Sequence, residues 1–241
     1  MIFRDLNLEK NLIENLESLG YKTLTPIQEN SLKYSLEKKD IIARAKTGSG
    51  KTLAFCLPII NNLDKKKYRV QSLILAPTRE LATQIAQTMR EVLRSTPNIK
   101  VLTLCGGVPY KPQVVSLSHE AHIVVGTAGR VLKHINEGNL KLENINTFVL
   151  DEADKMLDMG FFDDISKVSS LLPKQRQTLL FSATFSNEIK NLALEFLNNP
   201  VNIEVEDEEQ NIIKQVFYEV NSRDLKDNLI EKLIKKYQAN S

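Results

Sequence analysis

The 241-residue sequence contains little of what marks secreted, zinc-bound or membrane-embedded proteins. Its two cysteines, Cys56 and Cys105, are far apart and form no Cys-x-x-Cys pair, so neither a disulfide framework nor a zinc site is expected. The longest apolar runs, such as Leu53–Ile60, are far shorter than the roughly 18 residues that span a bilayer. The N-terminus has no charged-then-apolar signal profile. We therefore expect a cytoplasmic protein with reduced, buried thiols and no membrane partner.

The sequence also lacks a strong excess of charge of either sign. It has 32 Lys and Arg against 30 Asp and Glu, which gives a formal net charge of +2. Its pI of about 8.4 is below the value of roughly 9 that is typical of a basic nucleic-acid-binding domain. With 42% hydrophobic and 26% charged residues the chain can form a core, so a wholly disordered protein is excluded. Composition leaves the partner open.

Short apolar segments alternate with longer amphipathic ones. The expected strands are Asp40–Ala45, Ser72–Ala76, Lys100–Leu104, His122–Gly126, Thr147–Leu150, Gln177–Phe181 and Val201–Glu206. The expected helices are Leu8–Leu19, Pro26–Leu36, Lys51–Leu63, Arg79–Ser95, Gly129–Glu137 and Asn187–Leu197. Pro58 should kink its helix or end it early. Because most strands are continuously apolar, the alternation predicts an α/β fold, an open parallel sheet with helices on both faces.

Five acids between positions 204 and 209 follow the last expected strand. Such a run is usually a solvated segment, and its place after the sheet indicates a linker. Beyond it we expect a strand at Ile212–Val220 and a helix at Asp224–Tyr237, which are too little to bury a core. The predicted organisation is a domain of residues 1–205, an acidic linker of 206–211 and the truncated start of a second domain in 212–241. That last part could pack on the first domain or pair with a neighbouring chain.

The most specific motif is Ala45-Lys46-Thr47-Gly48-Ser49-Gly50-Lys51-Thr52, directly after an expected strand. Apart from Ala45 in place of the first glycine, it fits the phosphate-binding pattern Gly-x-x-x-x-Gly-Lys-Ser/Thr. The glycines let the loop turn its N–H groups toward phosphate oxygens, and the following helix adds the positive end of its dipole. Lys51 is expected to hold the β- and γ-phosphates and Thr52 to bind Mg²⁺. The alternative, a chance glycine-serine turn, is disfavoured by the strand–loop–helix order.

A second motif, Asp151-Glu152-Ala153-Asp154, follows the expected strand Thr147–Leu150. Asp151 is suited to hold Mg²⁺ directly or through water, and Glu152 to orient and deprotonate an attacking water. The alternative is an acidic strand end that caps the next helix. Together with the phosphate loop, the motif favours hydrolysis of a nucleoside triphosphate.

These motifs resemble those of a known family, the DEAD-box RNA helicases, which are named after the one-letter codes of a motif that residues 151–154 match. Further motifs of the family's first domain occur in order: Gly20–Gln28 as the Q motif with Phe3 as its upstream aromatic, Pro77–Ala82, Gly106-Gly107, Thr127–Arg130 and Ser182-Ala183-Thr184. The resemblance covers about residues 1–220. It implies a RecA-like P-loop domain that uses ATP and Mg²⁺ and binds RNA. Val101–Gly107 and Asp158–Phe161 are similar to the bacterial DbpA-like subgroup, which implies a role in ribosome assembly.

The resemblance also implies residue roles. ATP would be bound by Phe3, Tyr21, Lys22, Thr25, Gln28 and the loop 45–52, with the Gln28 amide selecting adenine over guanine. RNA would be bound by Pro77, Thr78, Arg79, Gly106, Gly107, Thr127, Gly129 and Arg130, mainly through its backbone and thus without sequence preference. Asp154, Ser182 and Thr184 would couple ATP to domain movement, with the two hydroxyls bonding Asp154. Without the other motifs, each group has an ordinary structural explanation. Thr25-Pro26 would be a helix start, Arg79 and Arg130 would form surface ion pairs, and Ser182 and Thr184 would stabilise a turn at a strand end.

Two departures from the family pattern matter. Ala128 replaces the usual proline of the Thr-x-Gly-Arg motif, which is expected to loosen that loop. After Thr184 the sequence contains one arginine, Arg223, whereas the family's second domain supplies arginines worth 10³–10⁵ in rate. We therefore expect this chain to bind ATP weakly, to hydrolyse it very slowly and not to unwind duplexes alone. An ATP-gated RNA clamp and a P-loop ATPase acting on protein or DNA are the alternatives, and the oligomeric state stays open.

Overall fold

The chain divides into two units, Met1–Glu206 and Asp207–Ser241, which are described separately. The computed structural model describes residues 1–119, 121–205 and 216–237. The segment 206–211, which was predicted to be a linker, lies outside these residues.

A parallel sheet forms the centre of the first unit. Within the described residues its seven strands are β1 (Ile41–Arg44), β2 (Ser72–Leu75), β3 (Val101–Leu104), β4 (Ile123–Gly126), β5 (Thr147–Leu150), β6 (Gln177–Ser182) and β7 (Val201–Glu204). Their order is β3-β4-β2-β5-β6-β1-β7, and each neighbouring pair is parallel. The carboxyl ends of all strands therefore meet at one edge. The predicted fold class and the seven predicted strands are confirmed.

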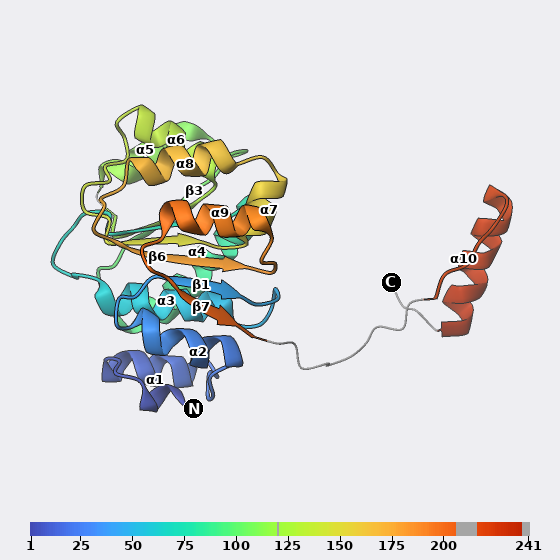
Figure 1. Ribbon diagram of the computed structural model, residues 1–241, viewed down its shortest axis with the longest axis horizontal. Coiled ribbons are helices and arrows are strands. Elements are labelled where there is room, and N and C mark those ends of the chain that lie inside the picture. The colour runs from blue at the N-terminus through green and yellow to red at the C-terminus, as the bar shows by residue number, and fades with distance from the viewer. Residues whose placement is uncertain (120, 206–215, 238–241) are drawn as a thin grey trace. The chain divides into compact units, whose positions relative to one another are not determined.

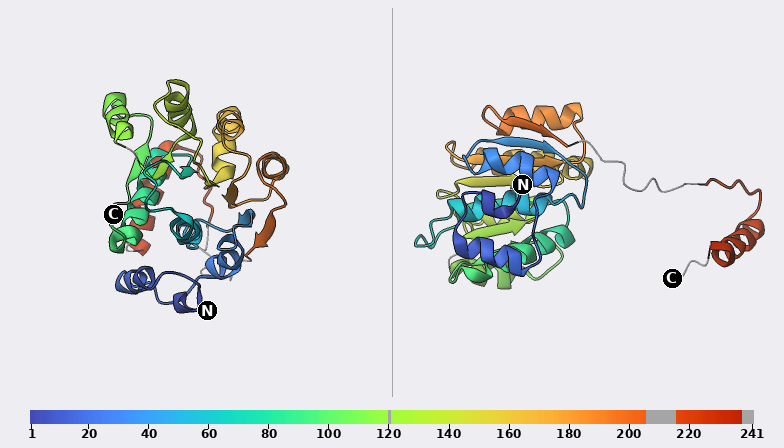
Figure 2. Two further views of the ribbon diagram at one scale, coloured as in Figure 1. Left: turned by 90° about the vertical axis from the view of Figure 1, so that its left-hand side faces the viewer. Right: turned by 90° about the horizontal axis from the view of Figure 1, so that it is seen from below.

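Helices cover both faces of this sheet (Figures 1 and 2). One face carries α1 (Lys10–Ser18), α2 (Pro26–Ser35), α3 (Lys51–Asn62) and α4 (Arg79–Val92), with 3₁₀ turns at Phe3–Asp5 and Leu93–Ser95. The other carries α5 (Tyr110–Ser118), α6 (Ala128–Asn136), α7 (Ala153–Asp158), α8 (Phe162–Ser170) and α9 (Asn187–Phe196). The six predicted helices of this unit are all present.

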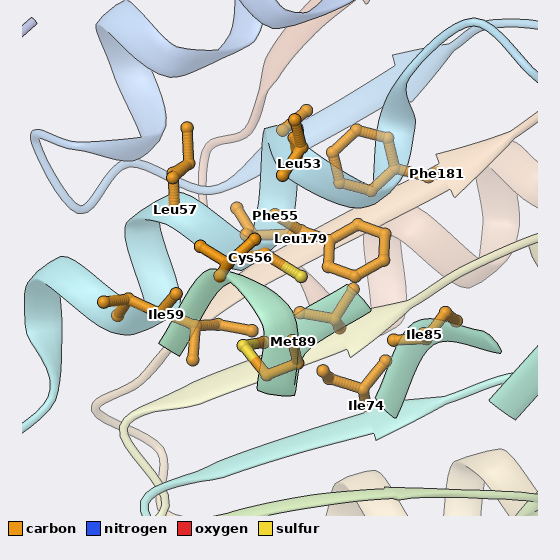
Figure 3. Close-up of a cluster of buried hydrophobic side chains, with 14 of the residues drawn as sticks. Leu53, Phe55, Cys56, Leu57, Ile59, Ile74, Ile85, Met89, Leu179 and Phe181 are labelled. Carbon is orange, nitrogen blue, oxygen red and sulfur yellow. The ribbon is translucent and has the colours of Figure 1, made fainter. Parts of the chain in front are cut away.

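Successive strand residues point to opposite faces and feed two separate hydrophobic clusters. Ile74 and Phe181 pack with side chains of α3 and α4 in the first cluster (Figure 3). Their chain neighbours Leu73 and Leu180 pack with α6, α7, α8 and α9 in the second. Burial on both faces is the reason why the strands read as continuous apolar runs.

Three features of the first unit bear on the predictions. α3 continues through Pro58 to Asn62, so of the two predicted effects of Pro58, a kink or an early end, the early end does not occur. The continuous burial of its side chains from Leu53 to Ile60 stabilises the helix around the proline ring. The predictions did not include α5, α7 and α8, which are six to nine residues long. Cys56 and Cys105 are free and buried, as predicted.

The second unit contains α10 (Arg223–Tyr237), which confirms the predicted helix. Residues 216–220 do not form the predicted strand, and residues 212–215 lie outside the described residues. Without a neighbouring strand, a single strand has no ladder hydrogen bonds to stabilise it. No side chain within 216–237 is buried. Among the described helices none has the length and apolar character needed to cross a bilayer.

Candidate functional site

The predicted site residues lie at the carboxyl edge of the sheet. The phosphate loop follows β1 and Asp151 follows β5, with β6 between these two strands. The loops predicted to contact RNA follow β2, β4 and β3, which are consecutive neighbours on the other side of β5. The edge is thus divided into one half that holds the predicted nucleotide contacts and another that holds the predicted RNA contacts.

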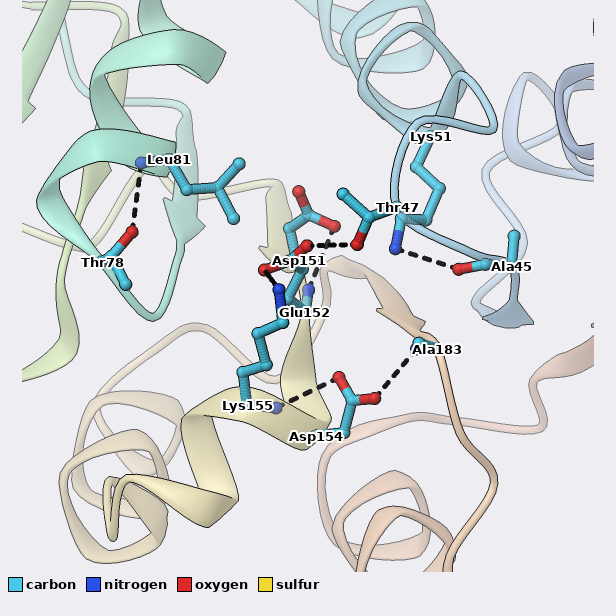
Figure 4. Close-up of polar contacts among 10 residues, drawn as sticks. All are labelled: Ala45, Thr47, Lys51, Thr78, Leu81, Asp151, Glu152, Asp154, Lys155 and Ala183. Carbon is cyan, nitrogen blue, oxygen red and sulfur yellow. Dashed lines mark hydrogen bonds and ion pairs between the residues drawn. The ribbon is translucent and has the colours of Figure 1, made fainter. Parts of the chain in front are cut away.

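The phosphate loop is held by two glycines and one buried lysine. Gly48 and Gly50 have φ angles of 84° and 97°, in the left-handed region that favours glycine. Gly50 is the N-cap of α3, so the first N–H groups of this helix are free to bind an anion. Lys51 is 6% exposed, and its Nζ donates to the Ala45 carbonyl at 3.0 Å (Figure 4). A phosphate would compete with one carbonyl for this ammonium.

Asp151 is a buried carboxylate opposite that loop. It is 2% exposed, and its Oδ1 accepts a hydrogen bond from the Glu152 N–H at 3.0 Å. Burial raises the pKa of Asp151 to about 6, although the charge of Lys51 acts in the opposite direction. The nearby ammonium of Lys51 therefore does not fully offset the cost of burying the Asp151 charge, and a cation beside this carboxylate would be favoured.

Glu152 joins the two motifs. Its Oε1 accepts a hydrogen bond from Thr47 Oγ1 at 2.8 Å, and its Oε2 lies 2.9 Å from Lys155 Nζ (Figure 4). Burial acts to raise the pKa of Glu152, but the hydrogen bonds from Lys155 and Thr47 outweigh it, so the pKa is lowered. Its backbone has φ 52° and ψ 51°, an unusual conformation for a side-chain-bearing residue that is common at functional sites. The carboxylate is thus ionised and aimed at the phosphate loop.

Gln28 fits directly against the phosphate loop. Its Oε1 accepts a hydrogen bond from the Thr25 N–H at 3.0 Å, and its Nε2 donates to the Gly50 carbonyl at 3.0 Å. A Cβ on Gly50 would lie 2.6 Å from Gln28 Nε2 and 2.8 Å from Thr25 Oγ1. The amide that was predicted to bind adenine is therefore bonded to the protein here, and its position depends on the loop.

A cavity of about 340 Å³ lies between these elements. The predicted residues that line it are Tyr21, Thr25, Gln28, Thr47, Gly48, Gly50, Lys51, Thr52, Asp151 and Glu152. Five further lining residues were not predicted: Thr23, Leu53, Leu81, Gln84 and Thr88. The last three share one face of α4, at a spacing of three and four residues, and this periodicity is the signal that could have identified them.

The remaining predicted nucleotide contacts lie outside this cavity lining. Phe3 is 2% exposed and packs in the hydrophobic core, and Lys22 is exposed to solvent. Ala45, Lys46 and Ser49 complete the loop, where Ser49 Oγ donates to the Lys46 carbonyl at 2.7 Å. The structure thus gathers most of the predicted nucleotide contacts at the cavity, whereas it places Phe3 in the core and Lys22 at the surface.

Two arginines predicted to bind RNA converge on the loop that contains Gly106 and Gly107. Gly107 has a φ of 73°, and a Cβ on it would lie 3.2 Å from Arg79 Nη1. Arg130 Nη1 donates to the carbonyl of Val108 at 3.2 Å. The structure therefore brings together three motifs that are spread over about 50 residues of the sequence.

The other predicted RNA contacts lie at helix starts beside these arginines. Pro77 is buried, and Thr78 and Thr127 are the N-caps of α4 and α6. Gly129 is exposed in the first turn of α6. This helix begins regularly at Ala128, which is 1% exposed, so the replacement of proline leaves the helix start formed.

Asp154 links α7 to the end of β6. Its Oδ2 accepts a hydrogen bond from the Ala183 N–H at 3.1 Å (Figure 4). Ser182 is buried, and its Oγ accepts from the Thr184 N–H at 3.3 Å. The predicted hydroxyl bonds to Asp154 are therefore replaced by a main-chain bond, because the Ser182 side chain is buried and caps the turn that follows β6.

The residues predicted to bind magnesium meet in the cavity. Thr52 and Asp151 both line it and supply a hydroxyl and a carboxylate, which are oxygen donors suited to Mg²⁺. Among the described residues, no group of three or more His, Cys, Asp and Glu could hold a metal by itself. This donor set fits an ion that takes its other ligands from water and phosphate.

Comparisons with known proteins agree with this arrangement. A family model described as "DEAD/DEAH box helicase" matches residues 25–192. The chain belongs to this family. One relative of this DEAD-box chain is the ATP-dependent RNA helicase DbpA of Escherichia coli, which is 45% identical over 230 residues. The match covers 95% of the chain but 50% of DbpA, so the chain spans about half the length of this curated relative.

Solved structures place the DEAD-box chain in the same fold. A DEAD box protein from the hyperthermophile Methanococcus jannaschii has a TM-score of 0.83 and 38% identity, over 99% of this chain and 64% of that one. Dbp5 of Saccharomyces cerevisiae, bound to RNA and ADP BeF3, has a TM-score of 0.77 and 32% identity, over 85% of this chain and 52% of that one. The RecA-like fold that the motifs implied is therefore confirmed.

Proposed function

We propose that this chain is the ATP-binding, RecA-like half of an ATP-dependent RNA helicase. In the whole protein, RNA-stimulated hydrolysis of ATP would drive local unwinding of RNA duplexes. The hydrogen bond between Thr47 and Glu152 carries the proposal, because it joins the phosphate loop to the acidic motif across one cavity. The name of DbpA and the RNA and nucleotide bound to Dbp5 support it.

The proposed mechanism assigns each cavity residue one task. Lys51 exchanges the Ala45 carbonyl for β- and γ-phosphate oxygens, and the free N–H groups of α3 hold the same phosphates. Glu152 accepts the proton of the attacking water, since its lowered pKa keeps the carboxylate ionised and so able to take a proton. Thr52 and Asp151 would hold Mg²⁺, which neutralises phosphate charge when bound.

The RNA-binding half of the sheet edge and a second RecA-like domain complete the proposal. Arg79 and Arg130 would bind RNA phosphates, which carry no sequence information. Arginines of the second domain would complete the γ-phosphate site, so the present residues alone would bind ATP weakly and turn it over slowly. The similarity to DbpA supports membership of a DbpA-like subgroup. A cytoplasmic location and a role in ribosome assembly are the parts of the proposal that rest on the sequence motifs alone.

The test compares nucleotide binding with turnover. A fluorescent ATP analogue should bind the chain, Lys51→Ala should abolish this binding, and Glu152→Gln should preserve it. In the full-length protein, RNA should stimulate ATP hydrolysis and Glu152→Gln should stop it. Glu195→Gln, which removes an exposed carboxylate of α9, is the matched control and should change neither quantity.

Two results would count against the proposal. Full-length turnover that is unchanged by Glu152→Gln would remove Glu152 as the base. Brisk RNA-stimulated hydrolysis by the 241 residues alone would show that no second domain is needed.

A further inference from the structure

Tyr110 lies between two of the loops proposed to contact RNA, and the mechanism above gives it no role. Its ring stacks on the His134 ring at a centroid distance of 4.3 Å and an interplanar angle of 19°. Lys133 Nζ lies 4.6 Å and Arg130 Cζ 5.4 Å from the centroid of the same tyrosine ring. Because these three α6 residues are three and four positions apart, one aromatic ring covers one helix face.

The hydroxyl of Tyr110 fixes the far end of the ring. It donates to Glu137 Oε2 at 2.7 Å and accepts from Asn139 Nδ2 at 3.0 Å. Glu137 is the C-cap of α6, so Tyr110 is bound along the whole length of that helix. The ring thus cannot turn away from Arg130 without breaking two hydrogen bonds.

A buried contact below the ring ties α5 to α6 and to β3. His134 Nε2 lies 3.1 Å from Gln113 Oε1, and Gln113 Nε2 donates to the Cys105 carbonyl at 3.1 Å. Both side chains are buried. The end of β3, which leads into Gly106 and Gly107, is therefore held to the helix that carries Arg130.

The guanidinium of Arg130 is oriented without being neutralised. It contacts the tyrosine ring and the Val108 carbonyl, and no carboxylate of the described residues forms an ion pair with it. Arg79 differs, because its Nη2 lies 3.0 Å from Glu80 Oε1. A guanidinium has five N–H donors, so the bond to Val108 leaves others for a phosphate.

We propose that Tyr110 is a positioning residue for RNA binding, which holds Arg130 in the orientation that receives an RNA phosphate. The inference rests on the proposed function, because it takes Arg130 as an RNA contact. A side chain that is ordered before binding loses less rotamer freedom on binding, and affinity rises accordingly. Lys133 also lies over the ring, but its Nζ is 3.8 Å from Glu137 Oε1, so its charge is already paired. The contacts of Tyr110 also stabilise the start of α6, which begins with Ala128 where the family pattern has a proline.

The test measures binding of a fluorescein-labelled ten-nucleotide U10 RNA to the chain by anisotropy across a series of salt concentrations. Tyr110→Leu should weaken binding about two- to fivefold, the effect of losing one exposed cation–π contact. It should also lower the salt slope toward that of Arg130→Gln, which loses about one phosphate contact. Tyr110→Phe keeps the ring and should keep most of the affinity. In the Arg130→Gln background, Tyr110→Leu should add nothing.

Each result decides between the two levels of the proposal. If Arg130→Gln binds U10 as tightly as the unchanged chain, both the proposed RNA contact and the role of Tyr110 are overturned. If Arg130→Gln weakens binding while Tyr110→Leu does not, or if their effects simply add, the role of Tyr110 alone is overturned. Affinity for a fluorescent ATP analogue reports folding, since Tyr110 does not line the cavity proposed to bind ATP. Tyr110→Met replaces Tyr110→Leu if the latter does not fold.

Discussion

At the residue scale, Gly48 and Gly50 share a backbone conformation but differ in their surroundings. Alanine at either position would be strained by about 1–2 kcal/mol in the left-handed region. A Cβ on Gly48 meets nothing within 4 Å, whereas one on Gly50 meets Gln28 Nε2 at 2.6 Å. We expect Gly50→Ala to lower the free energy of unfolding by at least about 1 kcal/mol more than Gly48→Ala. Urea unfolding measures both, and equal losses would contradict the contact with Gln28.

Asp151 makes stability depend on pH. Its pKa rises from a usual 3.8 to about 6 in the folded chain, so the folded state binds the proton more tightly. The resulting stabilisation is fully present below pH 3.8 and is lost as pH rises through 6, by roughly 3 kcal/mol. Asp151→Asn should therefore be more stable than the unchanged chain at pH 7, with the difference vanishing toward pH 4.

Urea unfolding at a series of pH values checks this expectation. Asp158→Asn removes an exposed carboxylate from the same segment and is the matched control. A difference between Asp151→Asn and the unchanged chain that does not vary between pH 4 and 7 would show that burial of Asp151 is not the cause.

At the scale of elements, α7 and the turn after β6 are linked through Asp154. Asp154→Ala removes the acceptor of the Ala183 N–H, and a hydrogen bond to a charged group contributes about 1.5–3 kcal/mol. We expect the Ala183 amide to exchange its hydrogen at least about tenfold faster in this variant. Asp154→Asn retains an oxygen acceptor and should keep most of the protection. Unchanged exchange in Asp154→Ala, measured by NMR, would mean that this bond does not hold the turn.

The elements also show how far the sequence alone could be interpreted. Strands such as β2 and β5 were predictable because burial on both faces leaves an apolar run. α5 was not predicted, because it contains Pro112 and buries Gln113 rather than an apolar stripe. Its Tyr110 therefore carried no signal, since the contacts with α6 depend on tertiary packing.

The candidate site divides in the same way. The loop around Lys51 was predictable because phosphate binding demands glycines, a lysine and a helix start in a fixed order. Gln84 and Thr88 were not predicted, because their spacing shows only that they share a face of α4, and that face lines the cavity through the packing of α4 beside α3. The bond between Asp154 and Ala183 involves a main-chain donor, which no side-chain pattern can indicate.

At the scale of the whole molecule, the two proposed activities share one sheet edge. β5 carries the acidic motif and directly neighbours β2, whose loop carries Arg79. The five acids between 204 and 209 offset part of the positive charge of the other residues. Without these acids the formal net charge is +7, since +2 + 5 = +7. A net positive charge of this size over the remaining residues favours binding of RNA phosphates.

The second unit provides the last prediction. Both hydrophobic clusters of the first unit consist of residues numbered 205 or lower. We therefore expect a chain shortened to residues 1–205 to unfold within about 2 °C of the full 241 residues and to bind a fluorescent ATP analogue equally well. The control is the 241-residue chain with both Ile230→Asn and Ile234→Asn. It should also unfold within about 2 °C of the unchanged chain and bind the ATP analogue equally well. A loss of several degrees in both proteins would mean that the apolar side chains of α10 stabilise the first unit, whereas a loss in the shortened chain alone would assign that effect to other residues of 206–241.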